Sequence, residues 1–385
     1  MKQMIYLDNA ATEKVFENAL SVAAKYSREL YFNPSGGASG SLAVNRDIGG
    51  ARETLAGILG CAKNEIIFTS GATEANNLVL RGAAKRRGAR VIISEGEHAS
   101  IYNTAKTLSD KFDVRIIPLK AQGQVDGEKL IDAVDENTAL VSLIHVNNET
   151  GAVNDICALA KAVKGKNKNC LFHSDGVQAF CKIGFALPPE TDFYTVSAHK
   201  IGGLKGTGAL FVRNGMKPNP IITGGKQENG LRAGTENVTG IMSFGAAAYE
   251  RFAGVEKNFQ NAAEINRIFV KTLSSIDNIS FNGDYNSALR TPNAKLNCSP
   301  YIMSVSIKGV KAETLAAVLD EKGVIVGLGS ACSAARSDNR VLASMNVKKA
   351  FIDGSIRLSF SNETTARDAE IAAGVIVATV KELRR

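Results

Sequence analysis

The sequence lacks the segments that carry a chain into or across a membrane. Residues 1–12 contain no basic region followed by an apolar one, and Asp8 already interrupts this stretch. The longest apolar runs, such as residues 371–378, are far shorter than the about 18 residues that a transmembrane helix needs. We therefore expect a soluble protein that has no membrane partner and works in the cytoplasm.

Cysteine and histidine are sparse, and neither is spaced for a structural role. The six cysteines stand far apart with no C-x-x-C pair, and without a secretory signal we expect reduced thiols. The four histidines match neither H-E-x-x-H nor a mixed Cys/His spacing that would hold zinc. The sequence therefore predicts no metal site.

Charge and composition exclude further classes of protein. Lys and Arg number 46 against 38 Asp and Glu, but no basic run interleaves with aromatic residues, so we expect no nucleic-acid partner. Hydrophobic residues make up 44% of the chain and charged residues 22%, which is typical of a folded enzyme and not of a disordered chain or a coiled coil. A length of 385 residues exceeds the usual size of one core, which predicts a large domain and a smaller one.

Short apolar runs alternate with helix-like segments between about residues 50 and 250. The runs lie at residues 66–69, 91–94, 114–119, 140–146, 171–174, 193–197 and 209–213. This alternation predicts a mainly parallel sheet covered by helices, with ligands at the carboxyl ends of the strands. Beyond residue 250 we expect a smaller α+β domain. Its predicted parts are a long helical stretch, a loop at 282–300, strands at 301–307 and 355–360, a helix at 311–322 and a final helix.

One segment could bind a phosphate group. Residues 69–74 form a small-residue turn between an apolar run and a helix that we expect to begin near Glu74. A helix N-terminus offers free backbone N–H groups and positive potential to an anion. The alternative is that Thr73 merely caps the helix. The glycine-rich residues 202–208 match neither nucleotide-binding motif, so a nucleotide cofactor is disfavoured.

Polar residues follow four further apolar runs. They are Glu97-His98, Asn147-Asn148-Glu149, Asp175-Gly176-Val177-Gln178 and Ser197-Ala198-His199-Lys200. Each group alone has a structural explanation, because Asp and Asn favour turns and a single His is often a core residue. Together with the helix N-terminus, they would bring an imidazole, an amide, an acid and a lysine to neighbouring strand ends. That set predicts one active site.

These residues belong to motifs that resemble the cysteine desulfurases of the class V aminotransferase group. The motifs are Tyr6-Leu7-Asp8-Asn9-Ala10-Ala11-Thr12, Gly71-Ala72-Thr73-Glu74, Val146-Asn147-Asn148-Glu149-Thr150-Gly151, Ser174-Asp175-Gly176-Val177-Gln178, Ser197-Ala198-His199-Lys200, Arg232-Ala233-Gly234-Thr235-Glu236-Asn237 and, for the NifS/IscS branch, Gly329-Ser330-Ala331-Cys332-Ser333. They span nearly the whole chain in order. The resemblance implies the pyridoxal 5'-phosphate (PLP) fold type I, with a mainly parallel seven-stranded sheet in a large domain at 16–250. A small α+β domain would comprise residues 1–15 and 251–385.

The resemblance also implies a role for each cofactor-site residue. Lys200 would form the Schiff base with PLP, which requires a neutral amine and therefore a lowered pKa. Asp175 would pair with the pyridine nitrogen. His98 would stack on the ring face and be catalytic together with Lys200 and Cys332, because its imidazole can also help move protons there. The remaining contacts are Gln178 and Asn148 at the phenolic oxygen, Ala72, Thr73, Ser197 and His199 at the phosphate, and Thr235 at the phosphate of the other subunit of a homodimer.

Arg357 and Cys332 carry the expected substrate chemistry. By resemblance, Arg357 grips the α-carboxylate of L-cysteine with help from Asn33; the alternative for Arg357 is a surface salt bridge. Cys332, aided by a cation such as Arg336, would take the sulfur as a persulfide and leave L-alanine. The sulfur would pass to an acceptor protein, for iron–sulfur cluster assembly or thiolation. The sequence leaves this destination open.

Two alternatives and two departures from the family pattern complete the picture. Selenocysteine lyase or another class V activity could use the same cofactor site, and a degenerate member could serve only as a binding platform. After Asn33 the family usually continues to a histidine, whereas residues 36–39 are Gly-Gly-Ala-Ser. Glu13 stands where a threonine is common, a change that we expect to be tolerated because Glu13 is not among the expected cofactor contacts.

Overall fold

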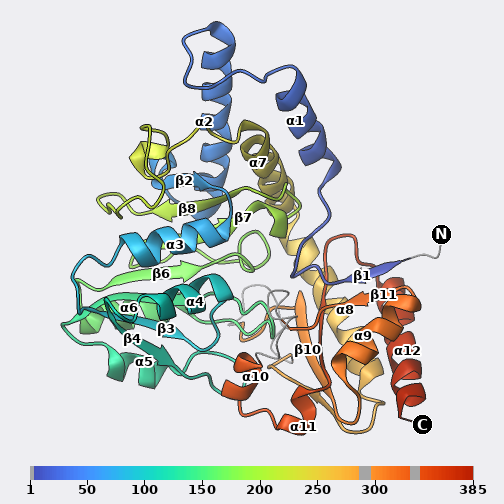
Figure 1. The fold of residues 1–385 in the computed structure, drawn as a ribbon. Helices are drawn as coiled ribbons and strands as arrows, with labels where there is room; N and C mark the ends of the chain where they lie inside the picture. Colours follow the sequence, from blue (N-terminus) through green and yellow to red (C-terminus); the bar gives the residue numbers. More distant parts are fainter. Residues whose placement is uncertain (1–3, 286–295, 330–338, 385) are drawn as a thin grey trace.

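The larger of the β-sheets is built from strands between Ile66 and Val212. The computed structural model describes residues 4–285, 296–329 and 339–384 (Figure 1). Seven strands form this sheet in the order β2-β8-β7-β6-β5-β3-β4. They are β2 (Ile66–Thr69), β3 (Arg90–Ser94), β4 (Asp113–Ile117), β5 (Thr138–Ile144), β6 (Leu171–Asp175), β7 (Phe193–Ser197) and β8 (Gly208–Val212). Only β8 runs against its neighbours, so the prediction of a mainly parallel seven-stranded sheet is confirmed.

Helices cover both faces of this sheet, because successive side chains of a strand point to opposite sides. Ile66 and Phe68 pack into the core cluster beneath α2 and α7, whereas Ile67 packs into the cluster beneath α3 and α4. Both faces are therefore buried, which is why these strands read as continuous apolar runs. The helices of this part are α1 (Glu17–Arg28), α2 (Ser39–Leu59), α3 (Ala72–Gly82), α4 (Ala99–Thr107), α5 (Gly127–Ala133), α6 (Ile156–Lys166) and α7 (Val238–Ala253).

The ends of the chain meet in a second, smaller unit beside the large sheet (Figure 1). Its strands are β1 (Ile5–Leu7) parallel to β11 (Val324–Val326), and β9 (Ile279–Phe281), β10 (Ile302–Ile307) and β12 (Ser355–Ser359) in an antiparallel sheet. Its helices are α8 (Val255–Leu273), α9 (Ala312–Glu321), α10 (Arg340–Ser344), α11 (Lys349–Ile352) and α12 (Ala366–Leu383). Ile5 and Leu7 share one core cluster with these C-terminal elements. We propose a small domain of residues 1–15 and 251–385 on this basis, beside a large domain of residues 16–250.

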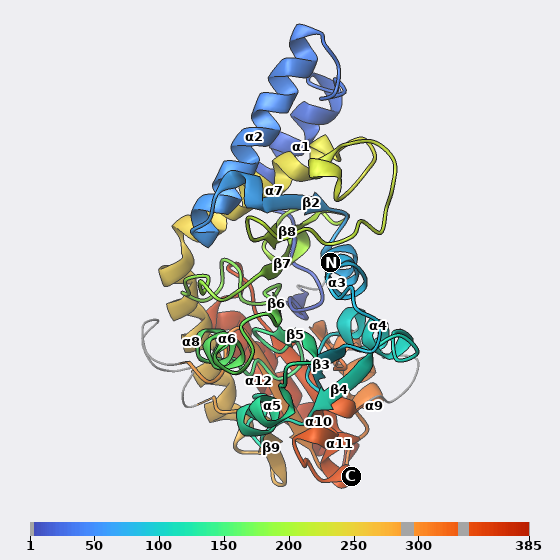
Figure 2. The same ribbon diagram turned by 90° about the vertical axis from the view of Figure 1, so that its left-hand side faces the viewer.

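Helices α1 and α2 extend away from the sheet (Figure 2). The segment that joins them carries two exposed aromatic residues. Tyr31 and Phe32 stack with their ring centroids 5.2 Å apart, and Tyr31 is 70% exposed. Among the described residues, none of the helices combines the length and apolar character that a membrane span requires.

Candidate active site

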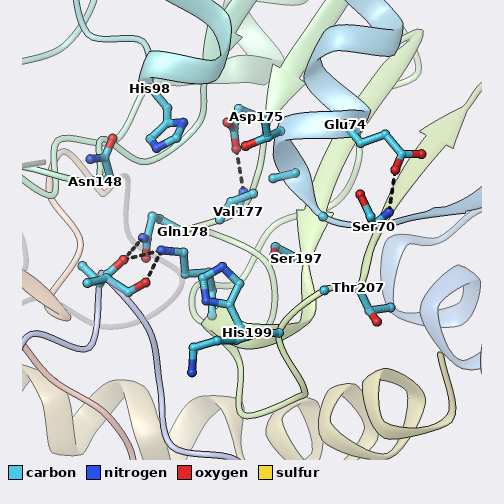
Figure 3. A pocket seen from close by; sticks show the side chains of 18 of the residues that line it. Ser70, Glu74, His98, Asn148, Asp175, Val177, Gln178, Ser197, His199 and Thr207 are labelled. Atoms are coloured by element: carbon cyan, nitrogen blue, oxygen red, sulfur yellow. Dashed lines mark hydrogen bonds between the residues drawn. The ribbon is translucent and has the colours of Figure 1, made fainter. Parts of the chain in front are cut away.

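A cavity of about 390 Å³ opens at the carboxyl ends of the parallel strands (Figure 3). Its size is that of a small-molecule site, and its place is the one expected for ligands of such sheets. Figure 3 shows His98, which follows β3, together with Asp175 and Gln178, which end and follow β6, around this cavity. Of the expected site residues, the cavity is lined by Ala72, Thr73, His98, Asn148, Asp175, Gln178, Ser197, His199, Lys200 and Arg357.

Lys200 closes the short 3₁₀ turn (Ala198–Lys200) that follows β7. Its Nζ donates to the backbone carbonyls of Ala10 and Ala11, both at 2.7 Å. Burial, helped by the cations Lys182 and Arg357, lowers the pKa of the Lys200 amine to about 7. Near neutral pH a substantial fraction of this amine is therefore uncharged and nucleophilic.

Asp175 ends β6 and is held on both of its oxygens. Oδ1 accepts from the backbone N–H of Val177 at 3.1 Å, and Oδ2 accepts from Nδ2 of Asn76 at 2.9 Å. The carboxyl is 3% exposed. Gly176 leaves room for the ring of Tyr194 beside this carboxylate, because a Cβ at this position would lie 1.9 Å from Cζ of Tyr194. The packing thus fixes a carboxylate at the cavity wall.

The imidazole of His98 lies at the N-cap of α4. Its Nδ1 accepts from the backbone N–H of Ser100 at 3.2 Å. Burial is the main cause that lowers the pKa of His98; Asp175 opposes that shift, and Lys200 adds to it. The ring is therefore neutral near pH 7.

An anion site is built at the N-terminus of α3. The helix begins at Ala72 with Gly71 as its N-cap, so the alternative that Thr73 caps the helix is wrong. Gly71 has φ 151°, a conformation that side chains rarely adopt, and it has no side chain to occupy the first N–H groups. These groups remain for a ligand. His199 stands beside them, neutral because burial lowers its pKa to about 3.

Arg357 is buried, which makes the alternative of a surface salt bridge wrong. Its side chain lies on β12 and is 3% exposed. Nη1 donates to the carbonyl of Asn148 at 2.8 Å, and Nη2 donates to Oδ1 of Asp8 at 2.6 Å. The guanidinium thus already binds one carboxylate, that of Asp8. An amino-acid substrate presents the same type of group.

The amino-acid sequence matches the model of one protein family, Aminotransferase class-V, over residues 5–371. The chain belongs to the class V aminotransferase family. The resemblance read from its motifs is therefore confirmed.

The curated relatives of this class V protein match it along its whole length. "Cysteine desulfurase IscS" of Dictyoglomus turgidum is 33% identical over 391 residues, covering 100% of this chain and 96% of the relative. A "Cysteine desulfurase" of Nostoc sp. is 34% identical over 387 residues, covering 99% and 94%. The two alignments therefore leave out only a small part of each relative.

Solved structures show the same fold. A "NifS-like protein" has a TM-score of 0.91 at 31% identity, covering 99% of this chain and 100% of that one. The structure "SspA in complex with cysteine" has a TM-score of 0.79 at 30% identity, covering 92% and 98%. PLP fold type I is therefore confirmed, and the protein is a PLP-dependent enzyme.

The residues of the class V chain fit PLP. An aldehyde needs a neutral amine, which Lys200 supplies with its pKa of about 7. A phosphate needs N–H donors and positive potential, which the N-terminus of α3 supplies beside Ser197 and His199. A pyridine nitrogen needs an acidic partner, which Asp175 supplies. These three features of the cavity match the three functional ends of the cofactor.

Three expected site residues lie outside this cavity. Asn33 and Thr235 are exposed, and their assignments stay predictions. Thr235 is the residue expected to reach the other subunit. Cys332, with its neighbour Arg336, lies outside the described residues, which stop at Gly329 and resume at Asn339.

Sequence reasoning missed several groups that the class V fold brings to the site. Ala10 and Ala11 act through their carbonyls, which no side chain announces. Asn76 lies inside α3 and does not follow a strand, so the pattern of polar strand ends does not point to it. Glu13, the departure that we expected to be tolerated, does not line the cavity. Its carboxylate lies in a buried triad, 3.0 Å from Nζ of Lys182 and 2.8 Å from Nη1 of Arg251. Pairing with two cations explains why a carboxylate is stable at this position.

Proposed function

We propose that the enzyme is a cysteine desulfurase that converts L-cysteine to L-alanine and captures the sulfur on Cys332. One observation carries the proposal: the cavity places the amine of Lys200, the carboxylate of Asp175 and the guanidinium of Arg357 around a single space. The full-length relatives named cysteine desulfurase support the same reaction. A second activity on this fold, selenocysteine lyase, differs in its substrate atom and remains the alternative.

Binding starts with the charged ends of the substrate. Arg357 binds the α-carboxylate of the substrate. In the structure, the carboxylate of Asp8 accepts the hydrogen bond from Nη2 of Arg357. Asn33 would assist from its loop. When bound, PLP supplies an electron sink next to the α-carbon. Lys200 moves protons there, because its pKa of about 7 lets the amine both accept and give a proton near neutrality.

The other cavity residues hold the cofactor. Asp175 would pair with its ring nitrogen, His98 with its ring face, and Gln178 and Asn148 with its phenolic oxygen. The phosphate contacts would be Ala72, Thr73, Ser197 and His199, with Thr235 of a second subunit. The exposure of Thr235 and of the aromatic pair at Tyr31 supports a homodimer.

Sulfur transfer needs a thiolate at Cys332. The C–S bond of cysteine breaks with its electron pair on carbon, and a bond forms between that sulfur and Sγ of Cys332. The carbon skeleton takes up a proton and leaves as L-alanine, so one cysteine and one thiol give one alanine and one persulfide. An acceptor protein, in iron–sulfur assembly or thiolation in the cytoplasm, would then remove the sulfur.

Replacement of Cys332 by alanine tests this function. Alanine formation from L-cysteine with a reductant is expected to fall by more than about 10²-fold, because no other thiol replaces the acceptor, while the cofactor stays bound. The exposed Cys157 offers the matched control: Cys157→Ala should retain activity. Equal activity in Cys332→Ala and the unaltered protein would refute the mechanism, and activity on selenocysteine alone would favour the alternative.

The pH dependence of cofactor attachment follows from Lys200. Its lowered pKa leaves the amine mostly protonated below pH 7 and mostly neutral above it. The rate at which PLP attaches to cofactor-free protein should therefore rise about tenfold per pH unit below that pKa and level off above it. Stopped-flow absorbance measures this rate. A continued rise towards pH 10 would mean that Lys200 titrates like a free lysine.

A further inference from the structure

Two side chains that do not line the cavity connect His98 with Asp175. Nδ2 of Asn76 is 2.9 Å from Oδ2 of Asp175 and 2.9 Å from Oγ of Ser100. Oγ of Ser100 is in turn 2.8 Å from Nδ1 of His98. Asn76 is fully buried, and Ser100 is 8% exposed. The four side chains thus form one chain of hydrogen bonds at the edge of the cavity.

The direction of each hydrogen bond in this chain is determined. The backbone N–H of Ser100 can only donate, so Nδ1 of His98 must be an acceptor without a proton. Oγ of Ser100 therefore donates its hydrogen to Nδ1 and accepts from Asn76. Asn76 cannot be flipped, because its carbonyl oxygen would then face the carboxylate of Asp175. Its two amide hydrogens are divided between Asp175 and Ser100.

We propose that Asn76 and Ser100 are positioning residues that fix His98 as the neutral tautomer with its proton on Nε2. Nδ1 carries two donors, and within residues 4–285, 296–329 and 339–384 no hydrogen bond engages Nε2, so Nε2–H is the end of the ring available to the cavity. His98 is then a hydrogen-bond donor and a stacking surface, not a base. This use of the ring rests on the proposed function; the tautomer itself rests on the hydrogen bonds alone.

The surroundings of His98 favour the neutral ring. It sits at the N-terminus of α4, whose positive potential opposes an imidazolium. Lys200, Arg340 and Arg357 face it from three other elements and also lower its pKa; Asp175 is the anion that opposes them. Burial is the largest cause of the lowered pKa of His98, and the three cations and the helix N-terminus act in the same direction against one carboxylate. Proton transfer is left to Lys200, whose amine titrates near neutrality.

Histidine-selective NMR tests the proposal, because the chain has only four histidines. The protein, with and without PLP, is labelled with ¹⁵N histidine, and His98→Gln assigns the signal. Between about pH 7 and about pH 9 we expect a proton on Nε2 and none on Nδ1. A proton on Nδ1, or an imidazolium, at pH 7 would overturn the tautomer. The spectrum needs no turnover, so a failure of the desulfurase proposal would leave it unaffected.

Substitutions at Ser100 test the positioning role. Ser100→Ala removes one of the two donors to Nδ1, and the measured pKa of His98 should rise by about 0.5 to 1. Ser100→Thr keeps the hydroxyl and should restore the original value. Ser142 is the matched control: its Oγ lies 2.8 Å from Nδ1 of His173, so Ser142→Ala should move only the signals of His173. A merely structural Ser100 would leave the pKa of His98 unchanged in Ser100→Ala.

Discussion

Replacement of Lys200 by arginine is expected to lower alanine formation by more than about 10³-fold, because arginine keeps its proton and cannot supply a neutral amine. Borohydride should fix the cofactor to residue 200 in the unaltered protein and should fix none there in Lys200→Arg. Peptide mass spectrometry reads the attachment site directly. The loss would be chemical and not structural if the variant still binds PLP without a covalent bond.

A second lysine provides the control for this substitution. Lys63 is exposed and pairs with Glu53 on the surface, so Lys63→Arg should change neither attachment nor rate. If Lys200→Arg kept more than about a tenth of the activity, the assignment of Lys200 would be wrong. If Lys200→Arg and Lys63→Arg both lost the cofactor, the cause would be a disturbed fold of the large domain and not the missing amine.

Replacement of Glu13 by alanine is expected to lower the free energy of unfolding by about 3 to 5 kcal/mol. Glu13, Lys182 and Arg251 have side chains that are at most 2% exposed, and the substitution leaves two buried cations without their carboxylate. Urea unfolding of the cofactor-free protein measures the change. Glu13→Gln keeps the shape but not the charge, so it should lose most of the same free energy.

The adjacent residue supplies a matched surface pair. Lys14 and Glu363 are 3.3 Å apart, and their side chains are 70% and 59% exposed. Water and salt screen such a pair, so Lys14→Ala should cost less than about 1 kcal/mol. Equal losses of unfolding free energy in Glu13→Ala and Lys14→Ala would show that the buried triad stabilises the fold no more than an exposed ion pair does.

The strands of the large sheet were predictable because burial on both faces makes them continuous apolar runs. All seven predicted runs agree with the observed strands to within two residues at each end. Strands β1, β9 and β11 were not predicted. Each has three residues, too few to show a pattern, and each is held by a partner elsewhere in the chain.

The candidate site was predictable where it depends on side chains that follow strands. Asp175, His98 and Lys200 are of this kind, and all three line the cavity. Contacts made through the backbone of Ala10, or from within a helix by Asn76, depend on how distant segments fold together. Local sequence carries no signal for such contacts, because a carbonyl group is common to every residue.

The two carbonyls that accept hydrogen bonds from the Lys200 amine are held in place by residues that are synthesised late in translation. Ala10 and Ala11 follow β1, whose hydrogen-bonding partner is β11 at Val324–Val326. A nascent chain therefore carries both the lysine and these carbonyls well before the strand that fixes them leaves the ribosome. Contacts of such long sequence separation form slowly, because a long loop must close before they are made. Capture of the cofactor is thus a step that follows synthesis of the whole chain, and a chain released before residue 324 is one without a finished pocket.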